Sequence, residues 1–309
     1  MKKEEICEIF LQRVGKSLTT NEPLANHCHF QIGGPADFFF VATKEEEMLA
    51  VVNLARECDL RFRVIGGGYN ILFDDRGYRG LIIKNGLRKI QRVDSYRIMV
   101  HSGTELAELI TFGQDFSLAG LEFLAGIPGT VGGAVYGNAG AFGHDIGECV
   151  ESVRLLNRSG EIIEIEPPHL QFSYRWSSLK NSQDIILSVK LKLKPGEKEA
   201  LKAKISEILK QRRNKLPSPT LPSGGSFFKN PLLPSGRKIA VAPLLEQVGA
   251  KGLRVGGAAV SQAHANFIYN LGGATAQDVL KLASSLKERI RRHFGLELEE
   301  EVIFLPEDA

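Results

Sequence analysis

Val64-Ile-Gly-Gly-Gly-Tyr-Asn-Ile-Leu72 is the stretch of sequence on which the fold depends. Its glycines at 66–68 remove three side chains in a row, so the backbone can approach a ligand and turn its N–H groups toward it. An anionic diphosphate is a typical ligand of such a loop. Apolar residues 62–65 predict a strand before the glycines, residues 71–77 have no helical period, and another apolar run follows at 81–83. We therefore expect the order strand, glycine loop, strand.

This order argues against a Rossmann dinucleotide site. That site needs a glycine loop that opens a helix, and an acidic residue about 20 positions further on. Without the helix, no helix dipole lies behind a bound phosphate. A glycine-rich hairpin loop that binds nothing is the alternative interpretation.

A second glycine-rich stretch makes that alternative weaker. It reads Gly120-Leu-Glu-Phe-Leu-Ala-Gly-Ile-Pro-Gly-Thr-Val-Gly-Gly-Ala-Val-Tyr-Gly-Asn-Ala-Gly140, with the polar residues Thr130 and Asn138 between the glycines. Such a density of glycine favours a surface on which a large flat ligand lies against bare backbone.

Composition places the chain among ordinary globular enzymes. Its 309 residues, 43% of them hydrophobic, suffice for a sizeable core and predict two or three domains. A formal charge of +3 without a basic block gives no sign of a nucleic-acid partner. No apolar run approaches the roughly 18 residues of a membrane span, and the N-terminus lacks the apolar region of a signal peptide. We expect a cytoplasmic monomer that does not bind membranes.

The cysteines give no sign of a disulfide framework or a metal centre. Cys7, Cys28, Cys58 and Cys149 are scattered without a C-x-x-C pair, so we expect no disulfides. His27-Cys28-His29 is the one fragment typical of a metal site. Alternate residues of a strand point to opposite faces, so we interpret this fragment as the entrance to a strand and expect no bound metal.

Hydrophobic periodicity predicts helices and strands in an α+β order. A proline-rich loop at 216–225 marks the sharpest change in composition, and Thr275 and Asp278 resemble a capping box before a helix that Gly295 ends. The helices are expected at residues 44–58, 105–112, 197–215, 242–248 and 275–294, and the strands at 38–41, 62–65, 81–83, 97–100, 153–156, 161–165, 185–193, 266–269 and 301–305.

Eight segments in one order, together extending from about residue 20 to 305, resemble a known family. They are Phe30-Gln-Ile-Gly-Gly-Pro-Ala36, the two glycine-rich stretches through Leu72 and Ala134, Asn138-Ala-Gly-Ala141, Tyr174-Arg-Trp-Ser177, Gly225-Ser-Phe-Phe-Lys-Asn-Pro231, Val260-Ser-Gln-Ala-His-Ala-Asn-Phe267 and Leu298-Glu-Glu-Glu-Val302. They resemble the UDP-N-acetylenolpyruvoylglucosamine reductases (UDP-N-acetylmuramate dehydrogenases), the flavoenzymes of the second committed step of peptidoglycan synthesis. The short span from Tyr174 to Ile185 is similar to the type II subgroup.

The resemblance implies an α+β fold whose FAD-binding part is of the vanillyl-alcohol-oxidase (PCMH) type. Two FAD-binding lobes are expected at residues 1–85 and 86–205, and an α+β substrate-binding domain at 206–309. The implied activity is that of an NADPH-dependent oxidoreductase acting on a CH–CH bond. It reduces UDP-N-acetylglucosamine enolpyruvate to UDP-N-acetylmuramate through FAD. Hydride addition to the vinyl CH2 leaves an enolate, which the protein must hold and protonate.

The family's catalytic residues match three positions of this chain. Ser226 matches the proton donor, Arg175 the arginine that faces the substrate carboxylate, and Glu301 the C-terminal glutamate. Without the resemblance, Ser226 is a turn residue beside two glycines, Arg175 a solvated arginine at a strand end, and Glu301 one member of an acidic run at 297–301.

The resemblance also implies the binding residues. Lys215, Lys229 and Asn230 suit a UDP diphosphate and a carboxylate, while His264 and Asn266 line the substrate site, although core packing explains His264 nearly as well. Cofactor contacts are implied for Gly33, Gly34, Gly66, Gly67, Gly68, Tyr69, Asn70, Ile71, Leu72, Gly126, Ile127, Pro128, Gly129, Thr130, Gly132, Gly133, Asn138, Ala139 and Gly140.

Several positions depart from the family pattern. Tyr69 stands where serine is usual, Gly137 where a bulkier residue is expected, and Glu300 and Ile303 replace a proline and an arginine. A flavin oxidase of the same fold and a non-catalytic protein that binds nucleotide sugars are the rival interpretations. Some of those oxidases attach FAD through a histidine in the first glycine loop, and residues 66–70 contain none, so we expect non-covalent FAD.

Overall fold

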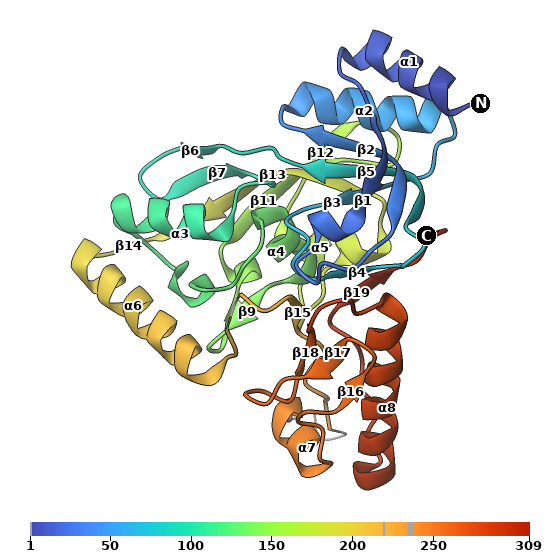
Figure 1. Cartoon of the computed structure of the whole chain (residues 1–309). Helices are drawn as coiled ribbons and strands as arrows, with labels where there is room; N and C mark the ends of the chain where they lie inside the picture. Colours follow the sequence, from blue (N-terminus) through green and yellow to red (C-terminus); the bar gives the residue numbers. More distant parts are fainter. Residues whose placement is uncertain (1, 219, 234–237) are drawn as a thin grey trace. The chain divides into compact units, whose positions relative to one another are not determined.

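The computed structural model describes residues 2–218, 220–233 and 238–309 (Figure 1). Contacts divide the chain into two compact units. Unit 1 comprises residues 1–20, 38–67 and 80–212, and unit 2 comprises residues 21–37, 68–79 and 213–309. Pro219, within the predicted loop at 216–225, lies outside the described residues.

The first glycine loop lies between strands, as the sequence predicts, but a short strand that was not predicted, at 71–73, comes before the predicted one at 81–83. β3 (Phe62–Ile65) leads into the glycines and β4 (Ile71–Phe73) follows them with no helix between. β3 pairs in parallel with β5 (Tyr78–Asn85). The other elements of this region are α1 (Lys3–Val14), β1 (Thr19–Pro23), β2 (Pro35–Ala42) and α2 (Glu45–Glu57). The sheet has the order β1-β2-β5-β3.

The second sheet lies in unit 1 and has the order β12-β11-β13-β7-β6, with every neighbouring pair antiparallel. α4 (Val131–Gly137) packs against β7 and β13 (Figure 1). The strands and helices of this region are β6 (Ile90–Arg92), β7 (Arg97–His101), α3 (Leu106–Asp115), β8 (Leu118–Ala119), β9 (Gly140–Ala141), β10 (His144–Asp145), β11 (Val150–Leu156), β12 (Ile162–Ile165), α5 (Pro167–Leu170), β13 (Ile185–Lys192) and β14 (Lys194–Pro195).

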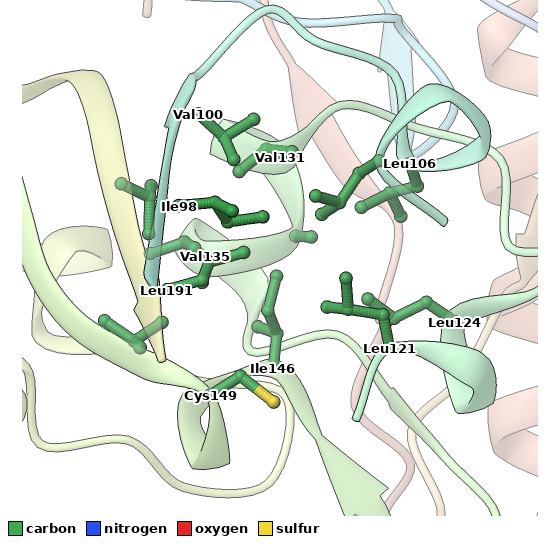
Figure 2. Close-up of a cluster of buried hydrophobic side chains, with 14 of the residues drawn as sticks. Ile98, Val100, Leu106, Leu121, Leu124, Val131, Val135, Ile146, Cys149 and Leu191 are labelled. Atoms are coloured by element: carbon green, nitrogen blue, oxygen red, sulfur yellow. The ribbon is translucent and has the colours of Figure 1, made fainter. Parts of the chain in front are cut away.

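Two hydrophobic clusters form the core of unit 1. Figure 2 shows side chains of the first cluster, in which Val131 and Val135 of α4 meet Ile98, Val100 and other residues of the sheet and loops. The second cluster lies under α1 and α2 and also contains Leu156, Ile185 and Leu187 from β11 and β13. This cluster therefore joins parts of both predicted FAD-binding lobes, whereas residues 21–37 and 68–79 of the first predicted lobe fall in unit 2.

Unit 2 contains a sheet in the order β15-β18-β17-β16, against which α8 packs through β16 and β17 (Figure 1). β19 (Ile303–Leu305) pairs in parallel with β4. The remaining elements toward the C-terminus are α6 (Lys198–Lys215), β15 (Ser223–Ser226), α7 (Val241–Gln247), β16 (Arg254–Val255), β17 (Ala258–Val260), β18 (Phe267–Asn270) and α8 (Ala276–Phe294).

Three local expectations need correction. The second glycine stretch contains the helix α4, which its low helix propensity hid. The last strand begins at Ile303 and not at Glu301, because the Glu301 N–H donates to the Phe227 carbonyl. Residues Leu24–His27 form a 3-10 turn, so His27-Cys28-His29 is not a strand entrance. No helix in the described part of the chain is long and apolar enough to cross a bilayer.

The predicted capping box of α8 is present and gives a test of stability. Thr275 Oγ1 accepts from the Asp278 N–H at 3.0 Å, and the Asp278 carboxylate accepts from the Thr275 N–H at 3.1 Å. Thr275→Ala leaves the Asp278 N–H without its hydroxyl acceptor, so we expect the free energy of unfolding to fall by about 1 kcal/mol. Urea unfolding followed by circular dichroism measures it. Ser285→Ala, which removes an exposed hydroxyl from the middle of the same helix, is the control and should be neutral; equal effects of both variants would contradict the capping role.

Candidate functional site

The first glycine loop combines close packing with available N–H groups. A Cβ on Gly66 would lie 2.6 Å from Thr130 Oγ1, and one on Gly68 would collide with the His27 carbonyl. Within the described residues, the N–H groups of Gly68, Tyr69 and Asn70 have no acceptor in the protein. Three consecutive N–H donors suit a phosphate. Gly66 and Gly68 are therefore required by the protein's own atoms, and the three N–H groups are available to a ligand.

Gly33 and Gly34 serve the packing of unit 2. A Cβ on Gly33 would lie 2.7 Å from Phe73 Cβ, and one on Gly34 would collide with the Asp75 carbonyl. The Gly34 N–H donates to the Asp74 carbonyl at 3.0 Å. These two predicted cofactor residues thus bring segment 33–34 against the chain that follows the first glycine loop.

The second glycine stretch satisfies most N–H groups at the start of α4 within the protein. The N–H groups of Val131 and Gly132 donate to the carbonyls of Thr104 and Ser102 at 2.9 and 2.8 Å, and the Gly133 N–H donates to Thr130 Oγ1 at 3.3 Å. The N-terminal end of α4 therefore has no N–H groups available to bind an anion at positions 131–133.

The residues just before α4 present bare backbone. In the described chain, the N–H groups of Gly129 and Thr130 have no acceptor. Gly129, with φ of 142°, and Gly137 have open space where a Cβ would stand. Ile127 and Ala139 are half-buried against the core of unit 1, and Pro128 is exposed. The open space at Gly137 leaves room for the bulkier residue expected there, and the platform for a flat ligand stays a prediction.

Arg175 stands on a strained turn in unit 1. Ser173 and Trp176 exchange backbone hydrogen bonds at 3.0 and 3.1 Å, which leaves Tyr174 and Arg175 at the corner. Arg175 has a φ of 56°, which costs a non-glycine residue on the order of 1–3 kcal/mol and is concentrated at functional sites. Its Nη1 donates to the Gly140 carbonyl at 3.0 Å.

Asn138 holds that turn in place. It is buried in the left-handed conformation, and its Nδ2 donates to the Ser173 carbonyl at 2.9 Å while its Oδ1 accepts from the Gly147 N–H at 3.1 Å. Ser177, also buried, donates to the Tyr136 carbonyl at 2.7 Å. The structure thus gives Asn138 a positioning role near Arg175. Its predicted contact with a cofactor stays a prediction.

Ser226 and Glu301 lie on neighbouring backbone segments of unit 2. The Glu301 N–H donates to the Phe227 carbonyl at 2.8 Å, and the Lys229 N–H donates to the Glu299 carbonyl at 2.9 Å. Ser226 follows an irregularity in β15 at Gly225, whose φ is 77°. The structure therefore places these two predicted catalytic residues on adjoining backbone segments, although they are far apart in sequence.

Ion pairs of unit 2 engage two acidic neighbours of Glu301, Glu299 and Glu300. Lys229 pairs with Glu299 at 2.8 Å, and this pairing holds the pKa of the Glu299 carboxyl below its usual range. Lys287 pairs with Glu300 at 2.8 Å. The backbone of Glu301 is also fixed, because Asn70 Nδ2 donates to its carbonyl at 2.9 Å. Asn70, a predicted cofactor residue, thus links the first glycine loop to Glu301.

The other predicted substrate residues have varied surroundings. Asn266 is buried, and its amide bonds both the N–H and the carbonyl of Phe228 at 2.9 Å. Asn230 Oδ1 accepts from the Val241 N–H at 3.0 Å, where α7 begins. His264 is half-buried, with its ring edge-on to Phe267, and burial lowers the pKa of its imidazole. Lys215 is exposed at the end of α6.

The sequence analysis considered His29 only as part of a fragment typical of a metal site and missed its place beside the first glycine loop. Its ring lies 5.5 Å from the ring of Tyr69, centroid to centroid, and its Nδ1 lies 2.8 Å from the Ser223 carbonyl. The His29 N–H also donates to the Gly68 carbonyl at 3.0 Å. His29 therefore connects the first glycine loop to the strand of Ser226. The sequence gives no sign of this role, which follows only from the spatial position of His29 beside Tyr69 and Ser223.

Comparisons with known proteins match both parts of the chain. Residues 36–166 match the FAD binding domain family, and residues 217–305 match the C-terminal domain family of UDP-N-acetylenolpyruvoylglucosamine reductase. The UDP-N-acetylenolpyruvoylglucosamine reductase of Carboxydothermus hydrogenoformans is 38% identical over 308 residues, covering 99% of this chain and 100% of the relative. The chain belongs to the UDP-N-acetylenolpyruvoylglucosamine reductase family.

Other members of the reductase family are similar to this chain over nearly its whole length. The reductase of Solibacter usitatus is 40% identical over 305 residues, which cover 94% of this chain and 97% of the relative. The crystal structure of UDP-N-acetylenolpyruvylglucosamine reductase from Thermus caldophilus has a TM-score of 0.76 at 33% identity and covers 92% of this chain and 97% of its own. The predicted fold class is confirmed: a PCMH-type FAD-binding fold with a C-terminal domain.

Asn266 allows a direct test of structure against binding. Asn266→Ala leaves the buried N–H and carbonyl of Phe228 without partners, so we expect the free energy of unfolding to fall by about 1–3 kcal/mol for each group. Urea unfolding measures the loss. Asn214→Ala, at an exposed position in α6, is the control and should have no effect. Unchanged stability together with weaker binding of UDP-N-acetylmuramate would show that Asn266 acts on the ligand instead.

Proposed function

We propose that this chain reduces UDP-N-acetylglucosamine enolpyruvate to UDP-N-acetylmuramate with NADPH and FAD, in the synthesis of peptidoglycan. The observation that supports this most directly is the hydrogen bond from Glu301 to Phe227, which brings Ser226 and Glu301 onto adjoining segments. Both residues stand in segments that match the reductase family along nearly the whole chain.

Bound FAD supplies the transfer of hydride from NADPH to the vinyl carbon of the substrate. The chain fits this cofactor through its two glycine stretches, which offer N–H groups at 68–70 and 129–130 to phosphate oxygens and open backbone at Gly129 and Gly137. We assign the cofactor contacts to the residues that the family resemblance names in these stretches. Without a histidine at 66–70, the FAD is bound non-covalently.

Arg175 holds the carboxylate of the substrate. A guanidinium stays charged at any working pH and grips a carboxylate with two parallel hydrogen bonds. The negative charge of the enolate spreads into that carboxylate, so Arg175 stabilises it as it develops. The strained turn of Arg175 and its buried supports at Asn138 and Ser177 keep the guanidinium in place.

Ser226 donates the proton to the carbon next to the carboxylate. A serine hydroxyl is a weak acid in water, but the enolate is a strong base, and a positioned donor suffices. Glu301, fixed through its backbone beside Ser226, orients the substrate or polarises the serine. Lys215, Lys229 and Asn230 supply charge and hydrogen bonds to the sugar nucleotide, with His264 and Asn266 behind them.

The division of labour follows the predicted domains. Residues 1–85 and 86–205 form the two lobes that hold FAD, and residues 206–309 bind the substrate. The chain acts as a monomer in the cytoplasm, where its substrate and NADPH are present. Neither nucleic acid nor membrane is a partner.

The state of the cofactor is a first test of the proposed function. The holoprotein, denatured by heat or acid, should release its flavin as FAD into the supernatant, because no covalent link is formed. Chromatography of the supernatant identifies the flavin. Flavin that stays with the precipitate, or FMN in place of FAD, would sink this assignment.

A second test separates the two half-reactions through Ser226. Ser226→Ala removes one hydroxyl from a half-buried position beside Gly225, so folding and FAD content should persist. Reduction of the bound flavin by NADPH should stay near the wild-type rate in stopped-flow measurements. Reoxidation by the enolpyruvyl substrate should slow by about 100-fold or more, the scale of general acid catalysis.

Ser226→Cys keeps an acidic proton and should recover part of the loss. Near-normal reoxidation in Ser226→Ala would mean that water or another side chain delivers the proton, and Ser226 would lose its assigned role.

A further inference from the structure

Arg212 presents an unsatisfied cation in unit 1. It lies near the end of α6, and its Nε is buried with no hydrogen-bond partner among the residues that the structure describes. The side chain occupies the space that Gly126 leaves free, since a Cβ at Gly126 would lie 2.9 Å from Arg212 Cδ. Its guanidinium carbon lies 5.8 Å from the centre of the Phe142 ring.

A second guanidinium converges on the same segment. Arg175 donates to the Gly140 carbonyl at 3.0 Å, two residues before Phe142. Burial lowers the pKa of Arg212, and the positive charge of Arg175 lowers it further. In the described chain, no acidic side chain forms an ion pair with Arg212. Two positive groups thus lie near one turn without a carboxylate from the protein beside Arg212.

This arrangement is unfavourable unless an anion is present. A buried N–H of a charged group that lacks an acceptor destabilises the fold, and like charges repel. Arginine is the side chain best suited to carboxylate and phosphate, because its planar fork donates two parallel hydrogen bonds. An oxyanion between the two guanidinium groups would accept from the Arg212 Nε–H and offset the repulsion.

We propose that Arg212 is a ligand-binding residue that works beside Arg175: the two guanidinium groups hold one oxyanion, a carboxylate or a phosphate, of a bound ligand. This inference deepens the proposed function and rests on it for the identity of the natural ligand. It also gives Gly126 a reason, since a side chain there would displace Arg212 from this position.

The test compares Arg212→Gln with Arg213→Gln in the FAD-loaded protein. Both variants remove one positive charge, but Arg213 is exposed, so it controls for the net charge. Calorimetry gives the dissociation constants for UDP-N-acetylmuramate, which has a carboxylate and a diphosphate, and for UDP-N-acetylglucosamine, which has only the diphosphate. Arg212→Gln should weaken UDP-N-acetylmuramate about 10-fold or more, the scale of one charge-assisted hydrogen bond, and Arg213→Gln less than about 2-fold.

The pattern of losses identifies the oxyanion. Weaker binding of UDP-N-acetylmuramate alone assigns the carboxylate, and equal weakening of both nucleotides assigns the substrate diphosphate. Loss of FAD during purification of Arg212→Gln, with FAD retained by Arg213→Gln, assigns the cofactor diphosphate. Normal FAD content and unchanged affinity for both nucleotides in Arg212→Gln would overturn the proposal.

A second measurement keeps this inference separate from the proposed function. Inorganic pyrophosphate and D-lactate present the two kinds of oxyanion without a nucleotide. At least one of them should raise the midpoint of thermal unfolding of the wild type and of Arg213→Gln more than that of Arg212→Gln. If the wild type bound neither sugar nucleotide, the proposed substrate would be wrong. The comparison of thermal shifts among the three proteins would still test the anion site. Equal shifts in all three proteins would refute the anion site.

Discussion

The backbone pairing of residues 226–229 with 299–302 is the constraint on which unit 2 depends. Because the Phe227 carbonyl accepts from the Glu301 N–H, the positions of Ser226 and Glu301 are set by the main chain. Buried Asn266 holds the same segment through both polar groups of Phe228, and Asn70 holds the Glu301 carbonyl. Several hydrogen bonds thus cooperate in one network, which fixes the backbone that carries Ser226 and Glu301.

In unit 1, buried side chains fix the position of Arg175. The turn that presents Arg175 has a backbone conformation that a non-glycine residue adopts only under constraint. Asn138, at the C-terminal end of α4, bonds the Ser173 carbonyl, and Ser177 bonds the Tyr136 carbonyl within α4. Val131 and Val135 in turn anchor α4 in the core. The packing of the sheet and helix therefore constrains the half-buried Arg175 in the same unit. The mechanism assigned to this family needs such rigidity, because the enolate must meet its charge partner as it forms.

Local patterns predicted most of the helices and strands, and long-range hydrogen bonds account for what they missed. The apolar stripe of α2 and the capping box of α8 are encoded within a few residues, so their predictions were confirmed. α4 escaped because glycine has a low helix propensity, and its stability comes from burial of Val131 and Val135. The family motifs named Asn138 and Asn266, but no motif tells whether an amide bonds a ligand or the backbone. His29 and Arg212 have no local signal, because their significance lies in partners distant along the chain.

The packing of the glycines has a consequence for how the cofactor arrives. Gly34, Gly66, Gly68 and Gly132 are required by atoms of the protein itself, so these loops have their shape before any ligand binds. Binding then fixes few additional backbone dihedrals, and little conformational entropy is lost on association. The N–H groups of residues 68–70 in the first stretch and 129–130 in the second are available to a ligand in these fixed loops. The protein's own packing thus sets the shape of these loops, so a ligand can bind there or leave without a change in the core.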